Sequence, residues 1–264
     1  SFIQYYFRAD TKYRVHSPSL FRFVNVVLET DHPYYCYGQI EKLRSALQAD
    51  KDYIEVMDLG AGSQFEKTTT RQISKIASTA VSNRSKCQQL HRIATFYNPQ
   101  SILELGTSLG LSASYLSNVA PTTTIEGSPA IAEIAHKVLN KQQLKSEIIT
   151  CDIGMVLEDL KEKGKQYDLI FADGNHRKDA TLSYFEKLQP LLSTKGVIVF
   201  DDIYWSKGMT EAWETIKEHP NVSRTIDLYT FGIVEIGPNE VRSHKTLIKS
   251  TLKPFQWGFL SGEA

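Results

Sequence analysis

From about residue 100 onward, short apolar runs alternate with stretches in which apolar residues recur at helical spacing. The stretch behind Pro129, for example, has apolar residues at i, i+3, i+4, i+7 and i+8 from Ile131, which is typical of an amphipathic helix. The runs are mostly continuous, as in parallel strands covered on both faces. Strand alternating with helix in this way predicts a doubly wound α/β domain. The runs are SILEL (101–105), TTTIEG (122–127), SEIITCD (146–152), YDLIFAD (167–173) and GVIVFDD (196–202).

The chain after the last of these runs has a different pattern. The segment SRTIDLYTFGIVEIG (223–237) contains two β segments with no helix between them. It predicts an antiparallel hairpin at the sheet edge. The tail after Pro238 is polar and weakly patterned, and it receives no assignment.

The first 95 or so residues have helical periodicity. Their apolar positions predict helices around residues 21–28, 43–47, 73–81 and 90–94. The pattern divides the chain into a helical N-terminal extension or lid (1–95), a core (96–237) and a C-terminal tail (238–264).

A glycine loop follows the first buried run of the core. In ILELGTSLGLS (102–112), a strand leads into Gly106 and Gly110 and then into a helix. Gly106 permits a tight turn, and Gly110 lets the backbone approach a ligand. The spacing is not G-x-G-x-x-G, and no Gly-Lys-Ser/Thr follows, so a Walker-type phosphate loop is excluded.

Acids end the strands around this loop. Glu104 precedes the loop, Glu126 ends the next strand and Asp152 ends the third. An acid at the second position can accept both hydroxyls of a ribose, and Asp152 could meet an adenine amino group. Any one of these acids could instead cap a helix. Acids at the ends of three successive strands favour a nucleotide-type ligand in the crevice at the carboxyl ends of the strands.

On these residues the chain resembles the class I S-adenosylmethionine-dependent methyltransferases. ELGTSLGLSASYLS (104–117) is similar to the first motif of the catechol O-methyltransferase-like subgroup. The resemblance covers roughly 85–237 and implies a Rossmann-like, seven-stranded sheet with an antiparallel C-terminal hairpin. It also implies that S-adenosylmethionine is bound by Glu104, Gly106, Thr107, Ser108, Gly110, Ser112, Glu126, Gly127, Asp152, Ile153 and Asp173.

Two other segments carry weaker resemblances. VHSPSLFRF (15–23) is similar to the start of a group of bacterial methyltransferases, which identifies no substrate. MDLGAGSQ (57–64) resembles the D-x-G-x-G form of the same cofactor motif. The polar sequence after it starts no buried helix, and no acid-terminated strand follows. We interpret it as a lid loop or a plain surface turn.

Carboxylates also end the fourth and fifth core strands. FADGNH (171–176) and VFDDIYW (199–205) place Asp173, Asp201 and Asp202 at the ligand edge of the sheet. Like charges held close together repel unless they are protonated or bridged by a cation. Oxygen ligands of this kind suit Mg²⁺ or a similar divalent metal, which could orient substrate oxygens and lower a hydroxyl pKa.

The resemblance supports the same three positions. Metal-dependent O-methyltransferases carry an Asp after strand four and an Asp-Asn or Asp-Asp pair after strand five. Asp202 stands where the catechol enzymes have Asn, as in sugar O-methyltransferases. His176 stands where the catechol enzymes have a catalytic Lys, and it could act as a general base beside Asp173. The alternatives are a helix cap, solvated loop acids and an ordinary exposed histidine.

The N-terminal region adds aromatic and basic residues. Many aromatic side chains lie in the first 40 positions. They could shape an acceptor pocket, or they could pack on the core or on a homodimer partner. Between Lys67 and Arg92 there are basic residues and no acid. This stretch is either a solvated helix face or an attractive surface for an anionic substrate.

Composition narrows the function classes. Thirty basic residues balance 30 acidic ones, which argues against a protein that coats nucleic acid or membrane by bulk charge. There is no apolar run of membrane-spanning length and no signal-peptide pattern. The scattered cysteines Cys36, Cys87 and Cys151 are expected to be reduced thiols in a cytoplasmic protein.

The predicted function is therefore an S-adenosylmethionine-dependent O-methyltransferase. Its acceptor would be a small molecule, anionic or aromatic, and Asp173, Asp201 and Asp202 would hold a divalent metal. The Asp-Gly-Asn-His motif lacks the Pro-Pro-aromatic signature of base N-methyltransferases. The alternatives left open are an RNA-modifying methyltransferase, a non-catalytic S-adenosylmethionine-binding module and an iron hydroxylase.

Overall fold

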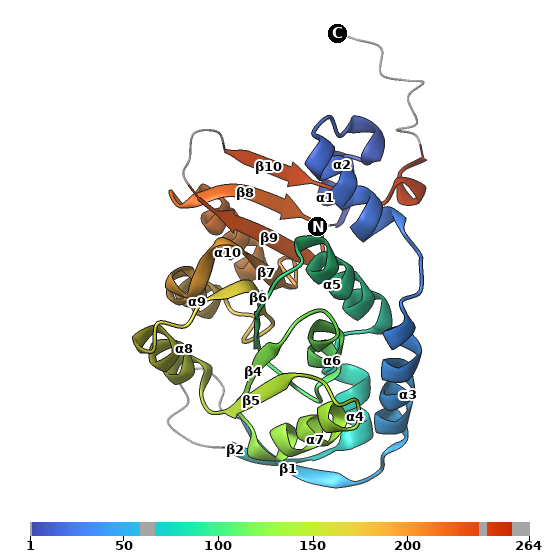
Figure 1. Cartoon of the computed structure of the whole chain (residues 1–264), viewed down its shortest axis with the longest axis vertical. Coiled ribbons are helices and arrows are strands. Elements are labelled where there is room, and N and C mark those ends of the chain that lie inside the picture. Colours follow the sequence, from blue (N-terminus) through green and yellow to red (C-terminus); the bar gives the residue numbers. More distant parts are fainter. Residues whose placement is uncertain (1, 59–66, 238–241, 255–264) are drawn as a thin grey trace.

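The computed structural model describes residues 2–58, 67–237 and 242–254. At its centre lies an eight-stranded sheet with the strand order β10-β8-β9-β7-β6-β3-β4-β5 (Figure 1). The strands from β7 to β5 are parallel to one another, and β9 pairs antiparallel with both β7 and β8. The strands are β3 (Ile102–Leu105), β4 (Thr122–Glu126), β5 (Ser146–Thr150), β6 (Tyr167–Ala172), β7 (Leu192–Asp201), β8 (Val222–Asp227), β9 (Phe231–Ile236) and β10 (Ser243–Thr246).

Both faces of this sheet are buried, as the continuous apolar runs predict. Neighbouring residues of a strand point to opposite faces, so Ile102 and Leu103 belong to different hydrophobic clusters. One face is covered by α5 (Arg84–Tyr97) together with N-terminal helices, and the other by α8, α9 and α10. The latter helices are α8 (Ile153–Glu162), α9 (Lys178–Leu188) and α10 (Lys207–Glu218). The predicted doubly wound α/β architecture is confirmed.

The C-terminal hairpin is present as β8 and β9, but it does not form the edge of the sheet. Strand β10, from the tail that received no assignment, pairs in parallel with β8. The sheet therefore contains the seven predicted strands and one more. The edge position of β10 explains the weak signal, because its four residues are all partly or fully exposed.

The N-terminal region contains helices and a small hairpin. Its helices are α1 (Phe2–Arg8), α2 (Pro18–Val24), a π-helical turn (Asn25–Glu29), α3 (Tyr35–Ala49) and α4 (Ile73–Thr79). An antiparallel pair, β1 (Tyr53–Asp58) and β2 (Lys67–Gln72), forms a separate two-stranded sheet. The sequence pattern had indicated a helical region here, so these strands are a correction. Most of MDLGAGSQ, from residue 59, lies outside the described residues, and its role as a lid stays a prediction.

Helices α3 and α4 pack against the start of the core rather than standing apart from it. They share a buried cluster with α6 (Leu111–Ser117) and α7 (Pro129–Asn140). Ile40 and Ile76 from the N-terminal region lie in this cluster with Tyr115. The residues assigned to an extension therefore belong to the same folded body as the core.

The two ends of the described chain are joined. Asp10 forms a β-bridge with Leu247, and the Tyr5 hydroxyl donates to the Leu247 carbonyl. The Lys253 ammonium donates to the carbonyls of Phe7 and Ala9, at 3.2 and 2.7 Å. In Figure 1 the blue N-terminal helices and the red C-terminal segment lie together beside β10.

Two sequence expectations concern the whole chain. No helix in the described part is long and apolar enough to cross a bilayer. The thiols of Cys36, Cys87 and Cys151 are all free, and the first two are buried.

Candidate active site

The glycine loop joins β3 to α6 in a conformation that only some residues tolerate. Gly106 has φ +94° and Gly110 has φ +80°. A Cβ on Gly106 would lie 2.5 Å from the Asp173 carbonyl oxygen, so glycine is required there. Gly110 lies close to helix α7, because a Cβ added to Gly110 would be 3.2 Å from the Cα of Ala135. The neighbour that the structure gives Gly110 is therefore a helix, and the predicted ligand approach stays untested.

Glu104 is fully buried at the carboxyl end of β3. Thr124 Oγ1 donates to its Oε2 at 2.6 Å, and the Thr107 hydroxyl lies 2.6 Å from that of Thr124. Its other oxygen, Oε1, has no hydrogen-bond partner among the described residues. Burial raises the pKa of Glu104 to about 7. Ser112, also buried, lies on the adjoining helix α6.

Glu126 ends β4 and is held by main-chain amides. Ser108 N–H donates to its Oε2 and Ser128 N–H to its Oε1, both at 2.9 Å. These bonds enclose Gly127 and tie the glycine loop to the next strand. Ser108 has φ +48°, so the loop carries strain at the position that contacts Glu126. Burial raises the pKa of the Glu126 carboxyl above its usual value.

Asp152 lies at the end of β5 and is exposed. Its Oδ1 accepts the Met155 N–H at 3.2 Å, so it is the N-cap of α8. Ile153, the first residue of that helix, is half-buried, and its Cδ1 lies 3.0 Å from the Cβ position of Gly174. The structure shows the capping role that the sequence left open, while contact with an adenine stays a prediction.

The acids after β6 and β7 meet, as the sequence predicts, and a lysine meets them. Lys86 Nζ lies 2.6 Å from Asp201 Oδ2 and 2.8 Å from Asp202 Oδ1. Asp201 is 2% exposed, and its Oδ1 has no hydrogen-bond partner among the described residues. Burial and the nearby Asp173 raise the pKa of Asp201 well above its usual value. We call Asp173, Asp201 and Asp202 the acid cluster.

His176 lies beside the acid cluster. Its Nε2 is 3.3 Å from Asp173 Oδ1, and its side chain is 31% exposed. Burial raises the pKa of Asp173 to about 7. Asp173, His176 and Asp201 each offer a ligand atom within 4.8 Å of the others, a grouping that could hold a metal ion. Asp202, the third predicted metal ligand, points its Oδ1 to Lys86 instead.

Sequence reasoning did not identify Lys86 as a site residue. It counted this lysine among the basic residues from Lys67 to Arg92. They are distributed over β2, α4 and α5, and Arg92 donates to the Val27 carbonyl at 3.0 Å. One signal was available in the sequence. Lys86 lies in the first turn of α5, where the helix dipole disfavours a cation.

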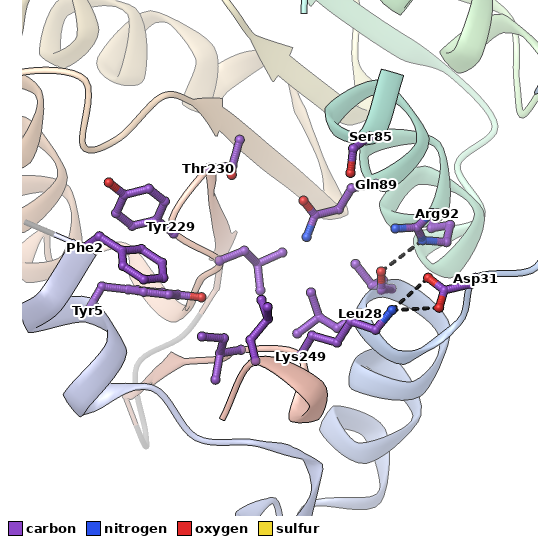
Figure 2. A pocket seen from close by; sticks show the side chains of 14 residues that line it. Phe2, Tyr5, Leu28, Asp31, Ser85, Gln89, Arg92, Tyr229, Thr230 and Lys249 are labelled. Atoms are coloured by element: carbon purple, nitrogen blue, oxygen red, sulfur yellow. Dashed lines mark hydrogen bonds and ion pairs between the residues drawn. The ribbon is translucent and has the colours of Figure 1, made fainter. Parts of the chain in front are cut away.

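A pocket of about 270 Å³ is lined by residues that adjoin the partners of the acid cluster, but by none of the three acids themselves. Ser85 and Thr230 line it. Ser85 precedes Lys86 in the chain, and the Thr230 carbonyl accepts the Asp202 N–H at 2.9 Å. Figure 2 shows the aromatic residues Phe2, Tyr5 and Tyr229 on one side and the polar α5 residues Ser85, Gln89 and Arg92 on the other.

The cations of the pocket already have partners. Lys249 Nζ pairs with both Asp31 carboxylate oxygens, at 2.7 and 2.8 Å (Figure 2). The guanidinium of Arg92 is bound to a main-chain carbonyl. The aromatic side chains are in contact, with ring centroids 5.1 Å apart for both Phe2–Tyr229 and Tyr5–Tyr229. The pocket is therefore more aromatic than cationic.

Comparison with solved structures finds the same fold in methyltransferases. The O-methyltransferase from Bacillus cereus, in complex with S-adenosylhomocysteine, is 19% identical, with a TM-score of 0.55 over 81% of this chain and 95% of that one. TomG from Streptomyces achromogenes, an O-methyltransferase of tomaymycin synthesis solved with S-adenosylmethionine, is 20% identical, with a TM-score of 0.52 over 60% and 82%. The S-adenosylhomocysteine-bound methyltransferase PaMTH1 from Podospora anserina is 18% identical, with a TM-score of 0.53 over 80% and 100%.

A family model described as "Methyltransferase domain" matches residues 103–203. This range begins in β3, includes the glycine loop and ends just after the acid cluster. The resemblance inferred from the glycine loop and the strand-end acids is confirmed. Residues 103–203 match a methyltransferase domain, and the chain has the fold of the class I S-adenosylmethionine-dependent O-methyltransferases.

Proposed function

We propose that the protein transfers a methyl group from S-adenosylmethionine to the hydroxyl of a small aromatic molecule. The observation that carries the proposal is the contact between the glycine loop and the acid cluster. A Cβ on Gly106 would meet the Asp173 carbonyl at 2.5 Å, so the loop and the Asp173–His176 pair adjoin. A cofactor on the loop and an acceptor beside His176 would then lie next to each other, which is the arrangement that a two-substrate transfer requires.

The residues at the loop fit the cofactor. Glu104 has a buried, unpartnered oxygen that can accept a hydrogen bond from a ligand. Glu126 is fixed by two amide donors, and each carboxylate oxygen keeps a lone pair for a ribose hydroxyl. When bound, S-adenosylmethionine supplies a methyl group on a positively charged sulfur. That methyl group would be available to the acceptor oxygen, with the electron pair of the C–S bond left on sulfur.

His176 is the proposed general base. It is partly exposed and lies 3.3 Å from Asp173, so the carboxyl group can orient the ring and stabilise its protonated form. Removing the acceptor proton makes the oxygen a better nucleophile. Asp173 acts through His176 in this scheme.

His176 does not line the pocket of Figure 2, so this pocket is proposed to hold the ring of the acceptor, with the hydroxyl directed past Ser85 toward the acid cluster. The pocket volume of about 270 Å³ suits a ligand of one or two rings, and Phe2, Tyr5 and Tyr229 offer ring faces. Because Lys249 and Arg92 already have partners in the described chain, an aromatic acceptor fits better than an anionic one.

Acids held this close together require a positive partner, and Lys86 supplies one at Asp201 and Asp202. The sequence predicts a divalent metal on Asp173, Asp201 and Asp202, whereas the grouping found in the described residues is Asp173, His176 and Asp201. A metal held there would stabilise the acceptor oxygenate. The residues fit it only in part, because Lys86 already bonds to Asp201 and Asp202.

The test uses His176→Ala with His136→Ala, an exposed histidine of α7, as the matched control. We would measure S-adenosylhomocysteine formation over a panel of small phenols and catechols. His176→Ala is expected to lose about 100-fold or more in turnover and to keep its affinity for S-adenosylhomocysteine, while His136→Ala behaves as wild type. Wild-type turnover in His176→Ala would remove the base role. Cofactor binding without turnover across the panel would favour a non-catalytic module.

A further inference from the structure

Lys86 occupies the position of a bound cation in the acid cluster. Its ammonium contacts carboxylates of two consecutive residues, 2.6 Å from Asp201 and 2.8 Å from Asp202. The lysine side chain is 12% exposed. Its nitrogen also lies 5.9 Å from the centre of the Phe231 ring. A buried ammonium between two acids and a ring face has the surroundings of a structural cation rather than of a surface lysine.

The backbone on both sides is arranged for this contact. The Asn83 side chain caps α5 by accepting the Lys86 N–H at 3.0 Å, which fixes the position from which the lysine extends. Asp202 has φ +49°, and its N–H is bound to the Thr230 carbonyl. A left-handed, non-glycine residue costs about 1–3 kcal/mol. That strain places two adjacent carboxylates around one ammonium.

Lys86 and a divalent metal would compete for the same acid. Asp201 belongs both to the ion pair with Lys86 and to the only metal-type grouping found in the described residues. A dication on Asp201 would face an ammonium that contacts the same carboxylate, and like charges at that separation repel. Metal binding would require Lys86 to leave the cluster.

We propose that the Lys86 ammonium is the resident cation of the acid cluster and that the protein works without a divalent metal. Two of its three N–H donors go to Asp201 and Asp202, and the third is left for an acceptor oxygen. The ligand class that this donor selects is a hydroxylated small molecule. This inference rests on the proposed function for its acceptor, but the choice between ammonium and metal is separate from it.

The experiment measures metal binding directly. Protein treated with a chelator and then dialysed free of it is titrated with MnCl₂ in a calorimeter. Wild type is expected to bind Mn²⁺ with a Kd weaker than about 1 mM. Lys86→Met, which removes the charge and keeps most of the length, is expected to bind Mn²⁺ at least about tenfold more tightly, because its carboxylates are then unpaired. Lys86→Arg keeps the charge and is expected to resemble wild type.

The matched control is Lys75→Met, at an exposed lysine of α4, which is expected to bind Mn²⁺ as wild type does. A wild-type Kd tighter than about 1 mM, or Lys86→Met binding no tighter than wild type, overturns the proposal. If Lys86→Met does not fold, the same comparison of Mn²⁺ affinity is made between Lys86→Gln and wild type, with the same criteria. Titration of wild type with S-adenosylhomocysteine in the same buffer separates the two proposals, because failure there counts against the proposed function alone.

Discussion

The two halves of the ligand edge hold their acids in different ways. On the β3–β4 side, Glu104 and Glu126 are bound by a hydroxyl and by main-chain amides. On the β6–β7 side, Asp201 and Asp202 are bound by an ammonium, and Asp173 lies beside an imidazole. Both sets lie at the carboxyl ends of neighbouring parallel strands, so the difference arises from the partners and not from the fold.

This difference separates two tasks. Neutral donors fix a carboxylate in place without cancelling its charge, which suits recognition of hydroxyl and amino groups on a cofactor. Charged partners cancel charge and can exchange protons, which suits chemistry on an acceptor. We refer to these as the amide-bound half and the ammonium-bound half.

The largest effect is expected where the halves touch. Gly106→Ala would place a Cβ 2.5 Å from the Asp173 carbonyl at φ +94°, and it should lower the free energy of unfolding by roughly 3 kcal/mol. It should also abolish S-adenosylhomocysteine binding. Gly164→Ala is the control, because Gly164 has φ +62° and nothing within 4 Å of its Cβ position. If chemical denaturation shows the same decrease in the free energy of unfolding for both variants, the contact with Asp173 does not contribute to stability.

The next prediction contrasts one acid from each half. Because burial raises the folded-state pKa of Glu104 to about 7 from 4.5, this group stabilises the fold below about pH 4.5 and loses that contribution as the pH rises through about 7. The free energy of unfolding of Glu104→Gln should therefore rise relative to that of wild type as the pH increases. The difference should grow by on the order of 3 kcal/mol between about pH 4 and pH 8.

Asp202→Asn is the counterpart in the ammonium-bound half. At pH 8 it should lower stability by about 1 kcal/mol, because it weakens a partly buried pair with Lys86. Urea denaturation of both variants against pH checks the pair of predictions. Changes of the same sign in the two variants at pH 8 would mean that the halves do not differ as described.

The smallest effect concerns Asp152, whose capping role is visible and whose ligand role is not. Asp152→Ala should lower the free energy of unfolding by about 1 kcal/mol, and Asp152→Ser should not, because serine also caps helices. If Asp152 meets adenine, both variants should bind S-adenosylhomocysteine about fivefold more weakly. Wild-type affinity in Asp152→Ser would leave Asp152 as a helix cap only and exclude it from the cofactor site.

Much of the amide-bound half could be predicted because its signals are local. The strand, the glycines and the acid of the next strand lie close together between Glu104 and Glu126. Positive φ at Gly106 and Gly110 follows from residue type and turn geometry. The continuous apolar runs likewise gave the parallel sheet and its two buried faces.

The ammonium-bound half was only partly predictable because it depends on contacts distant in sequence. Lys86 and Asp202 are separated by 116 positions, and no periodicity relates them. Strand β10 was missed because four exposed residues at an edge give little hydrophobic signal. In β1, Ile54 and Val56 do alternate with polar residues, a strand pattern that the nearby glycine motif obscured.

The junction between the chain ends has a consequence for the order of folding. Phe2 and Tyr5 line the aromatic pocket together with Ile248, Lys249 and Leu252, and the bond from Tyr5 to Leu247 spans 242 positions. Contacts of such high sequence separation form late, after most of the loop-closure entropy has been lost. We expect the pocket to be the last part completed in folding and the first opened by local unfolding, while the glycine loop, built from one contiguous segment, remains assembled.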